Sequence, residues 1–381
     1  MTDIHEWTAL RVVQAVEAGE TTVEAVANAC LERIEDREPD VQAWAFIDRD
    51  QVLRNARAMD AGPRRGLLHG APFGAKDIID TVDMPTAHGS PIYANRQPAR
   101  DATCVALCRA AGGLLLGKTV TTEFAHVFPG KTRNPHDAAR TPGGSSSGSA
   151  AAVGARMAPL AFGTQTTGSV IRPASFCGVV GYKPSHGDFG LSGVGQNAPS
   201  FDTLGIMARD VADVGLLRAV VMAAPYRPLD APPLSSLRLG LCRTPNWGVA
   251  EPSTQAAIED AAAHLSRAGA TVEDFAMPDG YEAVGDCLPL VSGYEFARVL
   301  AHERAHHSDK LSDKLLNGRV NDGDRCSYAD YRAALATIAA YRAKLADAFS
   351  GFDALLTPSA AGAAPVGLGA TGSPLFNGVW T

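Results

Sequence analysis

The sequence predicts an α/β fold in one domain spanning residues 1–381. Helical segments, short apolar strands and glycine-rich turns alternate through residue 184, the pattern of a sheet layered between helices. A strand, an amphipathic helix and a second strand follow at 237–242, 251–268 and 271–275, which predicts a βαβ-like unit. Of the 381 residues, 46% are hydrophobic, so the chain can bury a large core.

The first part of the chain, residues 1–62, is predicted to be helical. Residues 7–19 and 22–36 carry apolar side chains at helical spacing. Thr21 or Thr22 suits the N-cap of the second helix, because a threonine hydroxyl can accept a hydrogen bond from a free N–H of the first turn. We therefore expect a pair of helices before the sheet begins.

Residues 63–210 are predicted to form the catalytic core of the fold. A turn within 67–77 leads into a buried strand, and residues 103–111 have the pattern of a helix. The short apolar run at 113–118 predicts the next strand. Helix, strand and turn therefore follow one another as a layered sheet requires.

Residues 226–350 are predicted to form the substrate side of the protein. The proline-rich stretch 226–237 indicates a linker or long loop before the βαβ-like unit. Residues 294–307 and 328–349 are predicted to be helical, and 353–358 to be a buried strand. Nothing in the second part reads as a specific ligand motif, so its role is expected to be the shaping of a pocket.

Composition and charge narrow the class of protein. The net charge is −7 and the Lys and Arg residues are dispersed, which argues against a nucleic-acid partner. Seven cysteines without a Cys-x-x-Cys pair suggest reduced core thiols in a cytoplasmic protein. The first residues lack the pattern of a signal peptide, and the most apolar window, 150–163, is too short to cross a bilayer. We expect a soluble, cytoplasmic chain without a membrane partner, and whether it forms a homodimer stays open.

One lysine and two serines, each in a glycine-rich setting, suggest a serine nucleophile that uses no histidine. Lys76 ends the motif Gly70-Ala-Pro-Phe-Gly-Ala-Lys76, Ser145 lies within Gly143-Gly-Ser-Ser-Ser-Gly-Ser149, and Ser169 ends Gly163-Thr-Gln-Thr-Thr-Gly-Ser169. A serine hydroxyl needs a neighbouring base, and burial can hold a lysine neutral so that it serves as one. A second serine can relay the proton, because a hydroxyl both donates and accepts.

These motifs also match other kinds of site. The segment 143–149 is a flexible Gly/Ser loop in the plainest reading, but the helix-forming run at 150–155 indicates a turn that opens a helix. The same segment matches Gly-x-Ser-x-Gly, although a turn-rich stretch precedes it where a strand is required. It also lacks the Gly-Lys-Ser/Thr ending of a phosphate-binding loop. His302-Glu-Arg-Ala-His306 matches a zinc-protease helix, yet a solvated helix face is the simpler expectation.

Taken together, these residues resemble the amidase signature family. The resemblance extends over most of the chain, with weaker similarity at Asp202-Thr-Leu-Gly205 and at 353–358. The motifs that carry it are the stretch 70–77, Gly117-Lys-Thr119, Glu123-Phe-Ala125, Asn134-Pro135, the stretches 141–149 and 163–169, and Gly181-Tyr-Lys-Pro-Ser185.

The resemblance implies a fold and a set of site residues. The fold is a central mixed, twisted sheet flanked by helices. Ser169 would be the nucleophile, Ser145 the cis-serine relay, preceded by a cis peptide bond, and Lys76 the base. The oxyanion would be bound by the backbone N–H groups of four successive residues, namely Thr166, Thr167, Gly168 and Ser169. No metal and no organic cofactor are implied.

The sequence departs from the common family pattern in several places. Many members have Asp where Gln165 stands and Gly where Thr167 stands. Their arginine commonly follows the nucleophile by two residues, whereas Arg172 follows Ser169 by three. This spacing resembles a malonamidase-like branch in which the arginine binds a substrate carboxylate, as its bidentate geometry allows. A structural ion pair beneath the sheet is the alternative role for Arg172.

The sequence thus predicts an amidohydrolase that cleaves the C–N bond of a small, carboxylate-bearing amide through an acyl-enzyme. A glutamine-dependent amidotransferase subunit with a tRNA-binding partner is the first alternative. Family members usually continue beyond the point where this chain ends, so we also expect a C-terminal truncation. An inactive fragment is therefore the second alternative.

Overall fold

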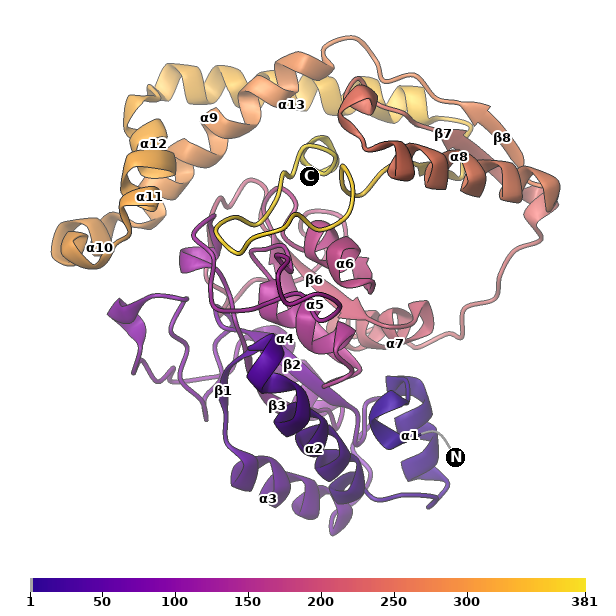
Figure 1. Ribbon diagram of the computed structural model, residues 1–381, viewed down its shortest axis with the longest axis vertical. Helices are drawn as coiled ribbons and strands as arrows, with labels where there is room; N and C mark the ends of the chain where they lie inside the picture. The colour runs from indigo at the N-terminus through magenta and orange to yellow at the C-terminus, as the bar shows by residue number, and fades with distance from the viewer. Residues whose placement is uncertain (1–2) are drawn as a thin grey trace.

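The computed structural model describes residues 3–381, and its centre is a six-stranded mixed sheet with the order β1-β3-β2-β4-β6-β5. Strand β2 runs parallel to β3 and β4, while β1 and β6 run antiparallel to their neighbours. This arrangement confirms the predicted α/β class (Figure 1). The strands are β1 (Trp44–Ile47), β2 (Pro72–Lys76), β3 (Leu114–Thr119), β4 (Leu160–Gln165), β5 (Val180–Tyr182) and β6 (Thr203–Ala208).

Helices cover both faces of this sheet. One apolar cluster joins α1, α4 and α7 to side chains such as Phe73 and Phe162, and a second joins α2, α3, α5 and α6 to Leu116 and Met207. Successive strand residues therefore alternate between two cores, as β geometry requires. The helices are α1 (Ala9–Glu17), α2 (Val23–Val41), α3 (Arg49–Asp60), α4 (Thr103–Ala110), α5 (Ser147–Gly154), α6 (Ile171–Cys177) and α7 (Val211–Val221).

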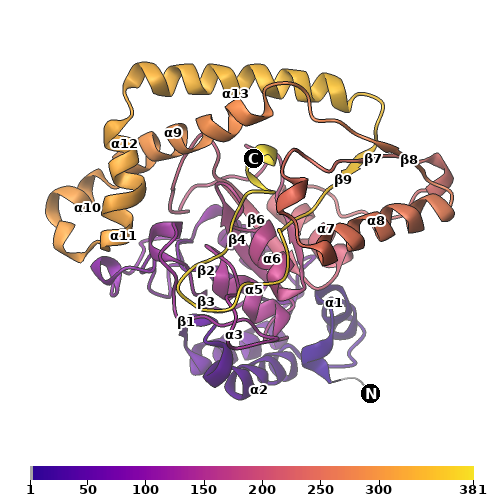
Figure 2. The same cartoon turned by 45° about the horizontal axis from the view of Figure 1, so that its top comes forward.

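The second part of the chain forms a smaller parallel sheet, with the order β8-β7-β9, and a group of helices. Its elements are β7 (Arg238–Leu241), α8 (Pro252–Arg267), β8 (Thr271–Asp274), α9 (Tyr281–Val299), α10 (Ala301–His306), α11 (Asp313–Leu315), α12 (Asn321–Arg325), α13 (Tyr328–Phe349) and β9 (Ala354–Leu356). Helices α9 to α13 arch over one end of the main sheet (Figure 2). We call these helices the helical cap. A π-helical turn, Leu316–Val320, joins α11 to α12.

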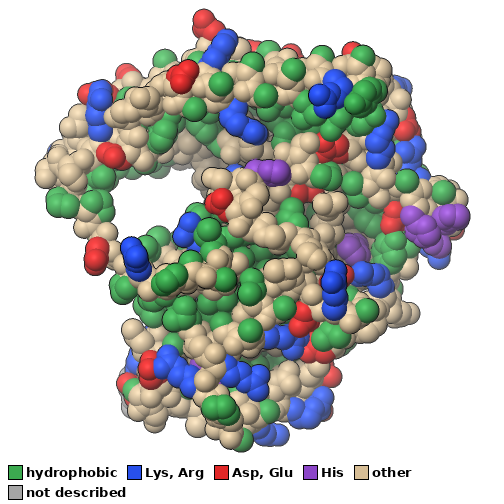
Figure 3. All heavy atoms as spheres, turned by 180° about the vertical axis from the view of Figure 1, so that it is seen from behind, with side chains coloured by type: hydrophobic (Ala, Val, Ile, Leu, Met, Phe, Trp, Pro, Cys, Tyr) green, Lys and Arg blue, Asp and Glu red, His purple; other side chains and the backbone are tan. Residues whose placement is uncertain are grey.

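The view from behind shows how the two parts meet. The surface is hollowed on the left of this view, between the part of the molecule that holds α8 and the smaller sheet and the part below it that holds α7 (Figures 1 and 3). Basic and acidic side chains are scattered over this face (Figure 3). In the described part of the chain, no helix combines the length and the apolar character needed to cross a membrane.

Most predicted elements are present with bounds close to those expected. Thr22 caps α2, its hydroxyl accepting a hydrogen bond from Ala25 N–H, and α13 has the predicted bounds. Three expectations need correction. The N-terminal part also contains β1. The helix expected at 294 begins at Tyr281, because the chain remains helical through Pro289. The last strand, β9, lies at the edge of the smaller sheet and is exposed to half-buried rather than buried.

Candidate active site

Lys76 is the last residue of β2, between β3 and β4 in the middle of the main sheet. Its side chain is fully buried, and its Nζ donates hydrogen bonds to Ser145 Oγ at 2.7 Å and to Thr164 Oγ1 at 2.9 Å. No carboxylate forms an ion pair with it among residues 3–381. A buried amine surrounded by hydroxyl groups keeps its hydrogen bonds but loses the solvation of its charged form.

This burial lowers the pKa of Lys76 from its ordinary value of 10.5 to about 7. The negative charge of Asp202 acts in the opposite direction and limits the shift. Close to neutral pH, a substantial share of the lysine is therefore the free amine, which is the form that can accept a proton. Thr164 was not among the predicted site residues, because a threonine within a buried strand carries no sequence signal of its own.

Ser145 lies in the turn that precedes α5, and the peptide bond between Gly144 and Ser145 is cis. The Ser145 side chain is 1% exposed, and its carbonyl oxygen accepts a hydrogen bond from Thr122 N–H at 3.2 Å. Helix α5 begins at Ser147, three residues earlier than the apolar run suggested. The segment is therefore an ordered turn that opens a helix, as predicted, and not a flexible loop.

Ser169 lies in the turn between β4 and α6. The carbonyl oxygen of Ser169 accepts a hydrogen bond from Ser146 N–H at 3.3 Å, so the two serine-bearing turns lie side by side. Its side chain is half-buried, and its hydroxyl has no hydrogen-bond partner within residues 3–381. The structure thus joins Lys76 to Ser145 directly and brings Ser169 beside that pair, without a direct bond between the two predicted hydroxyls.

The turn from Thr166 to Ser169 presents four consecutive backbone N–H groups that have no acceptor in the described chain. The next two N–H groups, of Val170 and Ile171, are taken by Gln165 Oε1 at 2.9 and 3.0 Å. Gln165 thereby caps α6 and leaves the preceding turn open to a ligand. At the sequence level Gln165 was only a departure from the family pattern, and this capping role was missed.

Asp202 holds the beginning of this turn. Its carboxylate accepts hydrogen bonds from Thr166 Oγ1 at 2.6 Å and from the backbone N–H groups of Asn197 and Ala198 at 2.7 and 2.9 Å. Burial nevertheless raises the pKa of Asp202, because these bonds offset only part of the lost solvation. Asp202 therefore acts on the site twice, through the geometry of Thr166 and through its charge on Lys76.

Arg172 is buried in the first turn of α6 and reaches the peptide unit that precedes Ser145. Its Nη2 donates to the carbonyl oxygen of Gly144 at 2.6 Å and to Thr371 Oγ1 at 3.3 Å. Its Nε has no partner, and the guanidinium forms no ion pair within residues 3–381. Burial lowers its pKa to about 10. The structural ion pair considered as the alternative role of Arg172 is therefore absent among the described residues. No acidic side chain of the described chain neutralises the charge of this guanidinium.

The remaining sequence motifs do not build a second catalytic centre. In His302-Glu-Arg-Ala-His306 both histidines are exposed, but Glu303 is buried and accepts a hydrogen bond from the Tyr93 hydroxyl, so this is not simply a solvated face. The chain before Ser145 forms turns rather than a strand, which rules out the Gly-x-Ser-x-Gly elbow. Within residues 3–381 no group of three His, Cys, Asp or Glu side chains is arranged to hold a metal ion.

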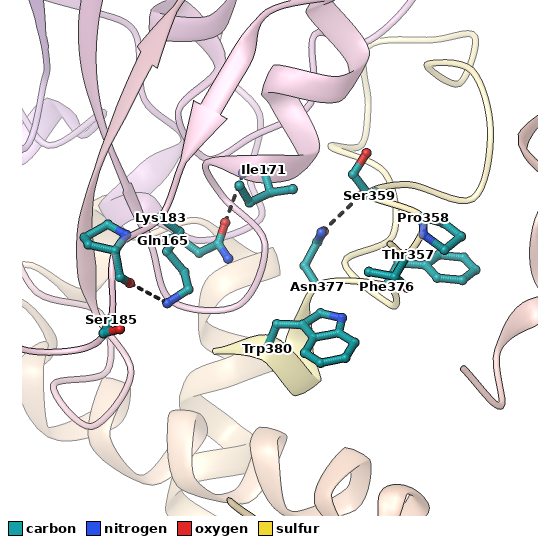
Figure 4. Close-up of a pocket in the computed structure, with 11 residues that line it drawn as sticks. Gln165, Ile171, Lys183, Ser185, Thr357, Pro358, Ser359, Phe376, Asn377 and Trp380 are labelled. Atoms are coloured by element: carbon teal, nitrogen blue, oxygen red, sulfur yellow. Dashed lines mark hydrogen bonds between the residues drawn. The ribbon is translucent and has the colours of Figure 1, made fainter. Parts of the chain in front are cut away.

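Two cavities adjoin the Thr166–Ser169 turn. One, of about 450 Å³, lies beside Gln165 and Ile171 and is shown with Lys183 and Trp380 in Figure 4. The other, of about 580 Å³, begins at Thr167 and extends between α9, the π-helical turn and residues 373–379. None of Lys76, Ser145 and Ser169 lines either cavity.

Similarity to known proteins identifies the family of this chain. The amidase family profile matches residues 25–373, so the chain belongs to the amidase family. A relative from Symbiobacterium thermophilum, named as a subunit of glutamyl-tRNA(Gln) amidotransferase, is 40% identical over 287 residues, 68% of this chain and 58% of that relative. A putative amidase AmiD from Mycobacterium bovis is 32% identical over 373 residues, 93% of this chain and 78% of the relative.

Solved structures agree with this assignment. A crystal structure of an amidase superposes with a TM-score of 0.88 at 30% identity, covering 98% of this chain and 89% of the other. A peptide amidase superposes with a TM-score of 0.79 at the same identity, covering 95% of this chain and 85% of the other. These neighbours confirm the predicted amidase-signature fold. The chain spans about three fifths of the length of the amidotransferase relatives that it matches.

Proposed function

We propose that the protein is an amidase that hydrolyses the C–N bond of a small amide with Ser169 as the nucleophile. The observation that carries this proposal is the buried contact of 2.7 Å between Lys76 Nζ and Ser145 Oγ, made by a lysine whose pKa is lowered to about 7. A base of that pKa beside a hydroxyl relay is what a serine nucleophile needs in the absence of histidine.

In this mechanism Ser169 Oγ attacks the amide carbon, and its proton passes through Ser145 to Lys76. The carbonyl oxygen of the substrate becomes an oxyanion and is bound by the Thr166–Ser169 turn, whose backbone N–H groups have no acceptor within the described chain. One such donor contributes about 2.7–4 kcal/mol to transition-state binding in other enzymes. The proton returns by the same route to the leaving amine, and water then hydrolyses the acyl-enzyme.

The experiment is the release of ammonia from a panel of amides by the wild type and by Ser169→Ala, Ser145→Ala and Lys76→Ala. Each variant is expected to lose roughly 100-fold or more in kcat, because each removes a member of one proton path. Ser253→Ala, at an exposed position on α8, is the matched control and should retain full activity. Turnover that survives Ser169→Ala would refute the assignment of the nucleophile.

For the substrate we propose a carboxylate-bearing amide, as in a malonamidase-like branch, with Arg172 binding an acid close to the reacting carbonyl. The uncompensated charge of Arg172 and its unpaired Nε support this role. Arg172→Ala should raise KM for malonamate far more than for a neutral amide of the same length. Equal effects on both substrates would assign Arg172 to the support of the Gly144 carbonyl instead.

A second candidate function is that of a glutamine-dependent amidotransferase component in the cytoplasm. It is favoured by the identity of 36–42% to proteins named as a subunit of glutamyl-tRNA(Gln) amidotransferase. The spacing of Arg172 from Ser169 argues against it. Glutaminase activity together with stable co-purification of a second protein would decide for this candidate, whereas turnover of malonamate by the isolated chain would decide for the first.

A further inference from the structure

The wall of the cavity that begins at Thr167 contains Arg319, a cation that forms no ion pair within residues 3–381, although the negative charge of nearby Asp322 acts on it. Arg319 enters its wall from the π-helical turn, a distortion that is frequent at functional sites. Arg319 Nε donates to His126 Nε2 at 3.0 Å, and its Nη1 donates to Ser292 Oγ at 2.5 Å. Its Nη2 has no partner, and within residues 3–381 the guanidinium forms no ion pair. Part of a positive charge therefore faces an open cavity.

His126 holds this guanidinium in place. Its ring stacks on Phe296 of α9 with 5.0 Å between centroids and an angle of 24°. Burial and the nearby Arg319 lower the pKa of His126 to about 3, so the ring is neutral and Nε2 can accept the hydrogen bond from Arg319. A protonated ring could not accept this hydrogen bond and would repel the guanidinium.

The same histidine is tied to the catalytic turn. Its carbonyl oxygen accepts a hydrogen bond from Thr122 Oγ1 at 2.5 Å, and Thr122 N–H donates to the carbonyl oxygen of Ser145. The intervening residues Phe124 and Ala125 both have positive φ, of 46° and 56°, so the segment follows a tight, defined path. His126 therefore bridges the helical cap and the turn that carries Ser145.

We propose that His126 is a positioning residue that fixes Arg319 as the cation of the substrate cavity, so that the enzyme selects amides whose far end carries a carboxylate. The proposal rests on the amidase function given above. Arg172 lies beside Gly144 and suits an acid next to the reacting carbonyl. Arg319 lines the cavity that begins at Thr167 and would bind an acid at the end of a substrate that extends into this cavity.

Two acids also line the cavity, Glu282 and Asp286 of α9. Both are exposed, so solvent and salt screen their repulsion of an incoming anion. Arg319 is half-buried, and its field is screened less. A singly charged carboxylate is therefore favoured at the inner end of the cavity, whereas the outer rim disfavours substrates with several negative charges.

The test compares glutaramate with pentanamide, a neutral amide with the same number of carbon atoms. His126→Phe keeps the stacking on Phe296 but removes the acceptor, so it should raise KM for glutaramate about tenfold and leave kcat and the kinetics of pentanamide unchanged. His126→Gln restores an acceptor and should recover most of the lost affinity. Arg319→Met should raise KM for glutaramate as much as His126→Phe does. The double variant should raise it no further, because both substitutions break the same hydrogen-bonded pair.

Matched controls are His264→Phe on α8 and Arg325→Met on α12, both exposed, which should leave the ratio of the two substrates unaltered. Malonamate, whose acid lies close to the amide, should respond to Arg319→Met less than glutaramate does. If His126→Phe impairs glutaramate and pentanamide equally, the ring has only a structural role and the inference fails.

A binding measurement separates this inference from the amidase proposal. Pentanoate, which carries a single carboxylate, should raise the Tm of the wild type and of Ser169→Ala alike, and the rise should vanish in His126→Phe and return in His126→Gln. The absence of a rise in the wild type overturns the inference whatever the turnover. Conversely, a His126-dependent rise in a protein that releases no ammonia would support the anion site and refute only the amidase function.

Discussion

Lys76 Nζ lies 2.7 Å from Ser145 Oγ and 2.9 Å from Thr164 Oγ1, and these two hydroxyls are the only hydrogen-bond partners of the amine within residues 3–381. Hydroxyls stabilise an ammonium ion less than carboxylates do, and burial removes its water. The position of this lysine at the end of a central strand therefore determines its acid–base behaviour as well as its geometry.

The rate of amide hydrolysis should depend on pH through Lys76. Because the free amine is the reactive form and its pKa is about 7, kcat/KM should rise with pH through an apparent pKa near 7 and level off above it. The measurement is kcat/KM for an amide without titratable groups between about pH 5 and pH 9. A rate that falls as pH rises over this range would contradict the assigned base.

The burial of Lys76 should also make the free energy of unfolding depend on pH. In the unfolded chain Lys76 titrates near 10.5 and in the folded protein near 7, so the unfolded state binds more protons between these values and stability rises with pH across that window. Lys76→Met removes the cost of burying the charge, which is greatest below pH 7. It should stabilise the protein by roughly 2 kcal/mol at pH 6 after the loss of two hydrogen bonds.

Urea unfolding of the wild type and of Lys76→Met at pH 6 and pH 10 checks this prediction. The difference between the two proteins should shrink as pH increases, because the folded lysine is then already neutral. Lys344→Met, at an exposed position on α13, is the matched control and should show no such trend. A variant that is less stable than the wild type at both pH values would count against a costly buried charge.

Asp202→Asn should shift the pH profile to lower pH. The charge of Asp202 raises the pKa of Lys76, so its removal lowers that pKa and moves the acid limb of kcat/KM downward. The asparagine still accepts a bond from Thr166 but cannot match every contact of the carboxylate, so kcat at the plateau should fall about tenfold. An unchanged acid limb would exclude Asp202 from the electrostatics of the site.

Local patterns in the sequence were enough to predict much of this fold. The cap at Thr21 or Thr22, the buried strand within 67–77 and the helix 328–349 are predictable because each depends on neighbours a few residues apart. The glycine-rich turns around Ser145 and Ser169 were predicted for the same reason. Periodicity and turn chemistry are properties of short segments, and these segments behave as their composition dictates.

The contacts that complete the site could not be predicted in this way. Thr164 meets Lys76 across 88 residues, Asp202 meets Thr166 across 36, and Arg319 meets His126 across 193. Each of these pairs depends on the packing of separate elements, and such packing produces no periodic pattern in the sequence. Helix α9 begins at Tyr281 and not at 294, and its packing against α13 joins residues that are far apart in the sequence.

Gly148 should be intolerant of any side chain. A Cβ atom at this position would lie 2.2 Å from the carbonyl oxygen of Ala43 and 2.3 Å from the backbone nitrogen of Val120. Gly148→Ala should therefore lower the free energy of unfolding by roughly 3 kcal/mol or prevent folding, because the obstacles are backbone atoms. Gly248→Ala, where a Cβ meets nothing within 4 Å, should change stability by about 0.5 kcal/mol at most.

The most direct measurement of the central claim is the identification of the acylated residue during turnover. Acid-quenched enzyme, taken in the steady state with malonamate and digested, is mapped by peptide mass spectrometry. The acyl group should be found on Ser169 and should be absent from Ser169→Ala. Acylation of Ser145 instead, or continued release of ammonia from an enzyme that never carries an acyl group, would contradict the mechanism.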